Sequence, residues 1–284
     1  MKTVNSLSGG KTSSYIAANY PADYNVFALV RIEDTKCTFP DKEIRKRVED
    51  KIKKPFIATA EMDTIIYTMF DLEQYIGKEI HWVSGPTFEE VIAHPSNNVL
   101  PSTLRRYCTA QMKVAPIFDW WLKTIAKPSI FNIGFRANEQ RRAKSVLERT
   151  VNGLLEQKHI TGKSKNGRNK WSTTSWQRPE FPLIKDRIYK DTIENFWSDK
   201  PVRFAQLNNC VGCFHRNEVL LKKMWDEEPK KMQWFANQEK GRKYKNDTFK
   251  MDNNITYEKI KQWKPQIELS FDDFSECDSG YCGL

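Results

Sequence analysis

A short stretch rich in serine and glycine follows the first apolar segment, and it restricts the fold more than any other feature of the chain. Its sequence, SLSGGKTSS, covers residues 6–14. Residues 1–7 are predicted to form a strand and residues 12–19 to start a helix, so the two glycines lie in the turn between them. Glycine lets backbone N–H groups approach an anion, and a helix start presents free N–H donors. The stretch therefore predicts a phosphate-binding loop.

This stretch differs from the phosphate-binding loop of the G-x-x-x-x-G-K-[ST] type. Gly10, Lys11 and Thr12 match the end of that motif, but Asn5 occupies the position of its first glycine. The alternative without a phosphate is a capped helix after a glycine turn. In the phosphate interpretation, the nucleotide-binding residues of the loop are Ser8, Gly9, Gly10, Lys11, Thr12 and Ser13.

Beyond the loop, strand-like and helix-like segments alternate. Apolar runs predict strands at residues 25–32, 55–59, 79–83 and 129–135, and spacing predicts helices at 41–53, 87–93, 104–125 and 191–197. The alternation predicts an α/β domain over residues 1–205 with a doubly wound, mostly parallel sheet. Residues 158–178, which are polar and basic, are predicted to be a mobile loop or a poorly ordered hairpin. Residues 206–284 are predicted to be a helical extension rich in cysteine and tryptophan.

The composition indicates a soluble protein with an anionic partner. The chain has 284 residues and a net charge of +10, which suits a nucleotide or a nucleic acid but is also compatible with general solubility. No apolar run approaches the ~18 residues of a membrane-spanning helix, and no signal peptide precedes the loop. We therefore expect a cytoplasmic protein with no membrane partner, in which the six cysteines do not form disulfides.

Five segments in order resemble the motifs of one superfamily. Residues 8–13 are similar to S-G-G-x-[DT]-S, 34–41 (DTKCTFPD) to D-T-G-x-x-F-P-E-T, 105–117 (RRYCTAQMKVAPI) to C-C-x-x-R-K-V-x-P-L, 134–142 (GFRANEQRR) to G-x-R-x-x-E-S-x-x-R, and 181–197 to P-L-I…D-I…W. By this resemblance the chain is identified as a member of the PP-loop and phosphoadenosine phosphosulfate (PAPS) reductase superfamily, of the phage and bacterial reductase-like type. The resemblance covers residues 1–215 and implies an adenine nucleotide alpha-hydrolase-like fold that binds ATP or PAPS.

The resemblance also assigns roles to residues outside the loop. It implies that Arg136 and Arg142 bind phosphate or sulfate, because guanidinium groups contact such anions bidentately. The further residues implied at the nucleotide are Asp34, Thr35 and Glu139, and Lys113 is implied as catalytic.

Three positions depart from the family pattern. Thr12 stands where pyrophosphatases carry aspartate, which puts simple ATP cleavage in doubt. Lys36 replaces a glycine, and Thr109 replaces the second cysteine of the C-C pair.

The cysteines form two separated pairs, Cys210/Cys213 and Cys277/Cys282. Two such pairs can close a tetrahedral zinc site or hold a [4Fe–4S] cluster, of which we expect the cluster. The resemblance offers a second set, Cys108 with Cys210 and Cys213, completed by Cys277 or Cys282; His215 is an alternative ligand. Magnesium is a further candidate beside the nucleotide.

The last three residues, C-G-L, match part of the E-C-G-L-H segment that carries the nucleophile of true reductases. Cys282 is therefore a candidate catalytic thiol as well as a candidate ligand. The resemblance implies sulfonucleotide reduction with a thiol donor such as thioredoxin as partner.

Two alternatives to sulfonucleotide reduction stay open. The first is an ATP-dependent adenylating sulfurtransferase that acts on DNA or tRNA, of the phosphorothioation or thiolation type. The second is a catalytically decayed module that senses a nucleotide or binds nucleic acid, for which Thr12 is the best support. An oligomer is compatible with each of the three.

Overall fold

The fold is built on a six-stranded sheet. The structure is a computed structural model, and it describes residues 1–244, 247–250 and 255–264. The strand order is β5–β2–β1–β6–β8–β7, in which the first five strands run parallel and β7 pairs antiparallel with β8. The strands are β1 (Thr3–Leu7), β2 (Tyr24–Ala28), β5 (Ile80–Val83), β6 (Ser129–Asn132), β7 (Leu155–Lys163) and β8 (Asn169–Glu180). The predicted α/β class with a mostly parallel sheet is confirmed.

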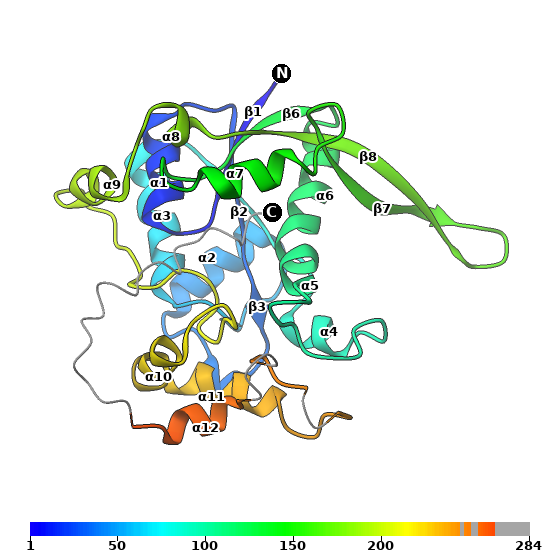
Figure 1. Cartoon of the computed structure of the whole chain (residues 1–284), viewed down its shortest axis with the longest axis vertical. Coiled ribbons are helices and arrows are strands. Elements are labelled where there is room, and N and C mark those ends of the chain that lie inside the picture. Colours follow the sequence, from blue (N-terminus) through cyan, green and yellow to red (C-terminus); the bar gives the residue numbers. More distant parts are fainter. Residues whose placement is uncertain (245–246, 251–254, 265–284) are drawn as a thin grey trace.

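Helices cover both faces of this sheet (Figure 1). Successive strand residues point to opposite faces, so Phe27 packs among the helices of one face, while Val26 shares a buried cluster with Phe118 and Trp121 of α6 (Ala115–Thr124) on the other. The helices on the Phe27 face are α1 (Lys11–Asn19), α2 (Lys42–Ile52), α3 (Thr64–Ile76), α8 (Pro182–Lys185) and α9 (Lys190–Trp197). This two-sided packing is the arrangement of a doubly wound fold.

The segment predicted as one strand at residues 25–32 is divided in the structure. After β2 the chain leaves the sheet, and β3 (Arg31–Ile32) pairs antiparallel with β4 (Ala58–Thr59) in a second, two-stranded sheet. Hydrogen bonds from Arg31 stabilise the point where the chain leaves the sheet. Its guanidinium donates to Ser84 Oγ at 2.9 Å and to the carbonyl oxygen of Gly85 at 3.0 Å. The prediction of one continuous strand was wrong, because the residues before and after the bend between β2 and β3 are both apolar and the sequence shows no break.

The helix predicted at residues 104–125 contains a wider turn. It runs through α5 (Tyr107–Thr109), a π turn η2 (Ala110–Val114) and α6 (Ala115–Thr124). Pro116 explains the wider turn, because proline has no N–H to donate to the carbonyl four residues earlier. Gly85 lies against this turn so closely that a Cβ there would be 2.8 Å from the Gln111 carbonyl oxygen.

Residues 158–178, predicted to be a mobile loop or a poorly ordered hairpin, form two regularly paired strands in the structure. The strands β7 and β8 pair from Leu155↔Gln177 to Lys163↔Asn169, and the hairpin projects from the body of the molecule (Figure 1). The last residues of β8 belong to the central sheet, where they pair with β6 from Ser129↔Gln177 to Asn132↔Glu180.

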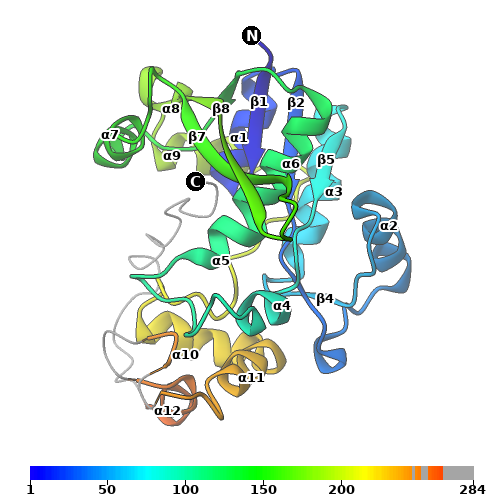
Figure 2. The same cartoon turned by 90° about the vertical axis from the view of Figure 1, so that its right-hand side faces the viewer.

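A helical layer follows the sheet domain in the chain. The helices α10 (Glu218–Glu227), α11 (Pro229–Gln238) and α12 (Tyr257–Gln262) pack together at one end of the molecule (Figures 1 and 2). They share a buried apolar cluster with α4 (Phe88–Ala93) and with Val30 and Ile32 of the sheet domain. The second cysteine pair, Cys277 and Cys282, lies outside the described residues. Within the described ranges, no helix has both the length and the apolar character that crossing a bilayer requires.

Candidate functional site

The glycine turn after β1 has a conformation that requires glycine. Gly9 has φ of +81°, and a Cβ on it would lie 2.4 Å from Cγ2 of Ile65 on α3. The following Gly10 is the N-cap of α1 and carries no side-chain cap. The first turn of α1 therefore presents backbone N–H groups without an intrahelical acceptor, as a phosphate-binding loop requires.

The hydroxyl of Ser13 holds the loop in shape. Ser8 donates its backbone N–H to Ser13 Oγ at 3.1 Å, and Ser13 Oγ donates to the carbonyl oxygen of Gly10 at 3.1 Å. Ser13 is buried. It therefore fixes the turn from inside, while Ser8 and Thr12 line the open recess in front of it.

This recess, the loop recess, has walls from three parts of the chain. The first wall is the loop itself, and the second is Gly134 and Phe135 after β6. The third is Asn208 and Asn209, which no motif in the sequence marks. Asn208 lies very close to Gly10: a Cβ atom added to Gly10 would be 2.3 Å from the Nδ2 atom of Asn208.

Three predicted nucleotide-binding residues lie away from the loop recess. Lys11 forms an ion pair with Glu194 of α9. Asp34 caps the short helix η1 (Thr35–Cys37) by accepting from Lys36 N at 2.8 Å, and it lines a separate groove with Lys36 and residues of α10 and α11. Thr35 lies in the same η1 turn.

The predicted anion-binding arginines gather around one carboxylate beyond Phe135. Arg136 donates to Glu139 Oε2 from its backbone N at 2.8 Å and from Nε at 3.2 Å. Arg142 donates to the other oxygen of Glu139 and stacks over the Phe135 ring at 4.2 Å. Since Phe135 also lines the loop recess, this cluster stands at the edge of the recess with a net charge of +1.

Three cysteines from two distant segments line a second recess, the cysteine recess. Cys108 comes from α5, and Cys210 and Cys213 come from the turn before α10. Thr109 and Lys113 line the same recess, as does His215, whose pKa is lowered to about 4, mainly by burial. Asn209 lines both recesses, so they share a wall.

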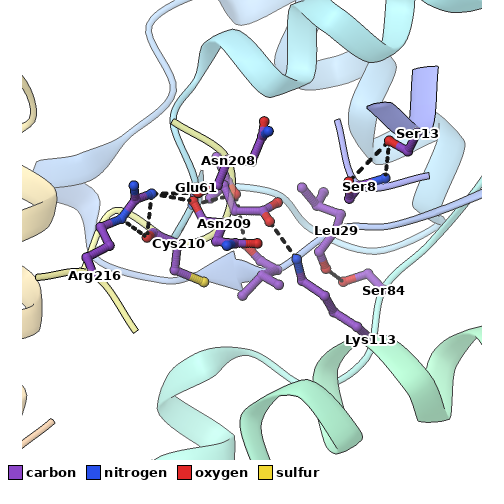
Figure 3. A network of polar contacts seen from close by, with 12 residues as sticks. Ser8, Ser13, Leu29, Glu61, Ser84, Lys113, Asn208, Asn209, Cys210 and Arg216 are labelled. Atoms are coloured by element: carbon purple, nitrogen blue, oxygen red, sulfur yellow. Dashed lines mark hydrogen bonds and ion pairs between the residues drawn. The ribbon is translucent and has the colours of Figure 1, made fainter. Parts of the chain in front are cut away.

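The turn that carries Cys210 and Cys213 is held from several sides. Cys213 N donates to the Cys210 carbonyl oxygen at 3.0 Å. The buried Arg216 donates to the carbonyl oxygens of Asn208 and Cys210 (Figure 3), and the Tyr257 hydroxyl donates to that of Gly212 at 2.9 Å. Arg216 and Tyr257 were not selected from the sequence, because their role depends on contacts made after folding.

A buried ion pair involves a lysine that lines the cysteine recess. Lys113 Nζ donates to Glu61 Oε1 at 2.7 Å, and both side chains are buried (Figure 3). Lys231 of α11 donates to the carbonyl oxygen of Glu61 and to Asp63 Oδ1, the latter at 2.7 Å. Two lysines therefore approach Glu61, and its Oε2 has no hydrogen-bond partner among the described residues.

The cysteine recess fits a metal site only in part. The thiol and imidazole groups around it have the right chemistry for zinc or iron. Among the described residues, no three His, Cys, Asp or Glu side chains stand close enough to hold a metal ion.

Comparisons with known proteins found no family model, no curated protein and no solved structure that matches this chain.

Proposed function

We propose that this protein is an enzyme of sulfur chemistry that binds an adenine nucleotide, of the PAPS reductase type. One observation carries the proposal: Asn209 lines both the loop recess and the cysteine recess. A nucleotide whose phosphates occupied the loop recess would have its sulfate or phosphate group close to thiol-bearing residues.

The first support is the chemistry of the loop recess. The first turn of α1 offers backbone N–H donors, and the hydroxyls of Ser8 and Thr12 line the same space. The cluster of Arg136, Glu139 and Arg142 adds a positive charge at the edge. Polyanion binding needs donors and positive charge together; the recess supplies the donors, and the cluster beside it supplies the charge.

The second support is the basic side chain in the cysteine recess. Lys113 is buried and held by Glu61, so its position is fixed. An ammonium group beside the transferred group would stabilise the negative charge that develops on a leaving phosphate.

In this reaction class a thiolate attacks the sulfur of the sulfonucleotide. An S–S bond forms, the S–O bond to the phosphate breaks, and the phosphate leaves with the electron pair. A thiol donor such as thioredoxin then attacks the enzyme sulfur, releases sulfite and is itself oxidised to a disulfide. The candidate nucleophile Cys282 lies outside the described residues.

The test is sulfite release from PAPS with a reduced thiol donor, compared between two asparagine variants. Asn209 and Asn152 both have positive φ, of 71° and 50°, so Asn→Gly is compatible with the backbone at both. Asn209→Gly should lower PAPS affinity and turnover at least tenfold, whereas Asn152→Gly, on the surface, should change neither. Equal effects of the two substitutions would argue against the shared wall as the site.

A second candidate function is adenylation of a nucleic acid by ATP, followed by sulfur transfer. The observation that favours it is the basic β7–β8 hairpin, a surface suited to a polyanion. Pyrophosphate release from ATP that depends on added DNA or RNA would support this candidate, and sulfite release from PAPS would support the first. Nucleotide binding with neither product would support a sensing module.

A further inference from the structure

The β7–β8 hairpin carries an uninterrupted set of positive charges. Residues 157–178 contain no Asp or Glu, and their basic residues are Lys158, Lys163, Lys165, Arg168, Lys170 and Arg178. Four of these, Lys163, Lys165, Arg168 and Lys170, surround the hairpin turn and are exposed; we call them the tip cations. In the part of the chain that the structure describes, none of the tip cations has an acidic partner.

The hairpin has an inner face, toward the body of the protein, and an outer face, toward solvent. The pairing of β7 with β8 shows which residues lie on each face. His159 pairs with Ser172, and its ring lies 4.9 Å from that of Phe118 on α6, so this face points to the body of the protein. Ile160 pairs with Trp171 on the opposite face. Ile160 is 49% exposed and Trp171 is 56% exposed. The outer face therefore presents a large aromatic ring to solvent.

A cation lies beside this ring. Lys158 Nζ stands 5.3 Å from the centre of the Trp171 ring, on the same outer face. An exposed aromatic ring flanked by positive charges suits a nucleic acid strand, because the ring stacks on a base while the cations contact phosphates. Inside a duplex the neighbouring bases cover both faces of each base, so the ring stacks most readily on a base in a single strand.

We propose that the outer face of the hairpin and its tip bind single-stranded nucleic acid, with an unpaired base stacked on Trp171 and the phosphate backbone passing around the tip along the tip cations. This inference goes beyond the proposed enzymatic function and does not depend on it. Only the end of β8 pairs with β6, so the outer part of the hairpin extends past the amino-terminal end of β6, whereas the loop recess lies at the carboxyl ends of the strands.

The test measures binding of fluorescently labelled 20-nucleotide single-stranded RNA and DNA, and of the matching duplexes, by anisotropy. We expect both single strands to bind and the duplexes to bind more weakly. Trp171→Ala should weaken single-strand binding by ~5- to 100-fold, the range for one stacked base. The control is Trp263→Ala, because Trp263 is also an exposed tryptophan, at 42%, but lies at the end of α12.

The charge contribution is tested by salt dependence. Replacing the four tip cations by glutamine should make the slope of log K against log[salt] shallower by about 3, since each phosphate contact to a single strand contributes about 0.7. The control replaces four exposed lysines elsewhere, Lys42, Lys46, Lys53 and Lys144, with the same change in net charge. A similar slope change in the control would show that net charge alone is responsible and would overturn the proposal.

Two further results would overturn it. Duplex binding as tight as single-strand binding would exclude stacking on an unpaired base. Absence of oligonucleotide binding, together with a smaller oligomer in light scattering of Trp171→Ala, would assign the outer face to contact between copies of this chain. Neither result depends on enzymatic turnover. The nucleic acid proposal can therefore fail while the sulfite assay succeeds, and the reverse also holds.

Discussion

The Arg216 guanidinium donates to the carbonyl oxygen of Cys210 from two of its nitrogens, Nε at 3.3 Å and Nη2 at 3.2 Å. The same side chain reaches the carbonyl oxygen of Asn208 at 2.6 Å. One buried arginine therefore fixes both the shared wall of the two recesses and the turn that carries the cysteine pair.

Arg216→Met should destabilise the protein by about 3 kcal/mol, because it leaves buried carbonyl oxygens without donors. Urea unfolding would measure the change. The control is Arg203→Met: Arg203 pairs with Asp71, but its side chain is 60% exposed, so its loss should cost no more than about 1 kcal/mol. A smaller loss for Arg216 than for Arg203 would contradict this role.

The buried pair of Lys113 and Glu61 should show strong energetic coupling. Lys113→Met should cost about 3–5 kcal/mol, because it leaves a buried carboxylate without its partner. The double variant with Glu61→Gln should cost less than the sum of the single changes. A double-mutant cycle from urea unfolding measures the coupling, and the exposed pair of Lys2 and Asp23 serves as the comparison. Coupling as weak as in that pair would be inconsistent with the burial.

Metal content should depend on the cysteines of the cysteine recess. If Cys108, Cys210 and Cys213 are ligands, each Cys→Ser change should lower bound zinc or iron and the melting temperature together. The control is Cys37→Ser, because Cys37 packs in the apolar cluster and burial raises its pKa to about 11. Anaerobic purification with metal analysis is the measurement. Full occupancy in all three variants would exclude this set.

The same metal analysis extends to the second cysteine pair. Metal loss in Cys277→Ser or Cys282→Ser would identify a ligand outside the described residues. If Cys282→Ser instead keeps its metal but loses turnover, Cys282 is the catalytic thiol.

Glu239 should make stability fall as the pH rises through the weakly acidic range. Burial, with smaller contributions from Asp247 and Glu258, raises its pKa to about 7. Between pH 4.5 and 7 the folded state holds a proton that the unfolded state has released, so stability decreases with pH across this window. Glu239→Gln cannot titrate there.

The difference in stability between wild type and Glu239→Gln should therefore shift by about 3 kcal/mol from pH 4.5 to 7 and stay constant above pH 7.5. Melting temperatures of both proteins between pH 4 and 8 would show it. Parallel pH profiles would contradict the raised pKa.

The sequence predicts those parts of the fold that depend on local pattern. The glycine turn, the alternation of strands and helices, and the parallel sheet follow from apolar runs and turn residues close together in the chain. The helix α3 could also have been predicted, since Ile65, Met69 and Leu72 recur at helical spacing and Gly77 ends the helix.

The candidate site is less predictable because its contacts join distant segments. Lys11 is predicted to contact a phosphate, and the structure adds an ion pair with Glu194, 183 positions later, which no local pattern indicates. Asn208 and Asn209 have no periodicity or motif that marks them, and they become part of the site only when Arg216 folds their segment against the loop. The role of β8 in the central sheet was missed because its polar sequence gives no sign of the pairing with β6.

The strand β8 also has a structural consequence. It runs without interruption from the exposed Trp171 into the sheet, and the carbonyl oxygen of Glu180, its last residue, accepts from the N–H of Ile133 in the wall of the loop recess. A bulge at Trp176 interrupts its pairing with β7, and a bulged strand bends at that point. The arm that carries Trp171 and the segment that pairs with β6 therefore lie on either side of a bend in one continuous strand.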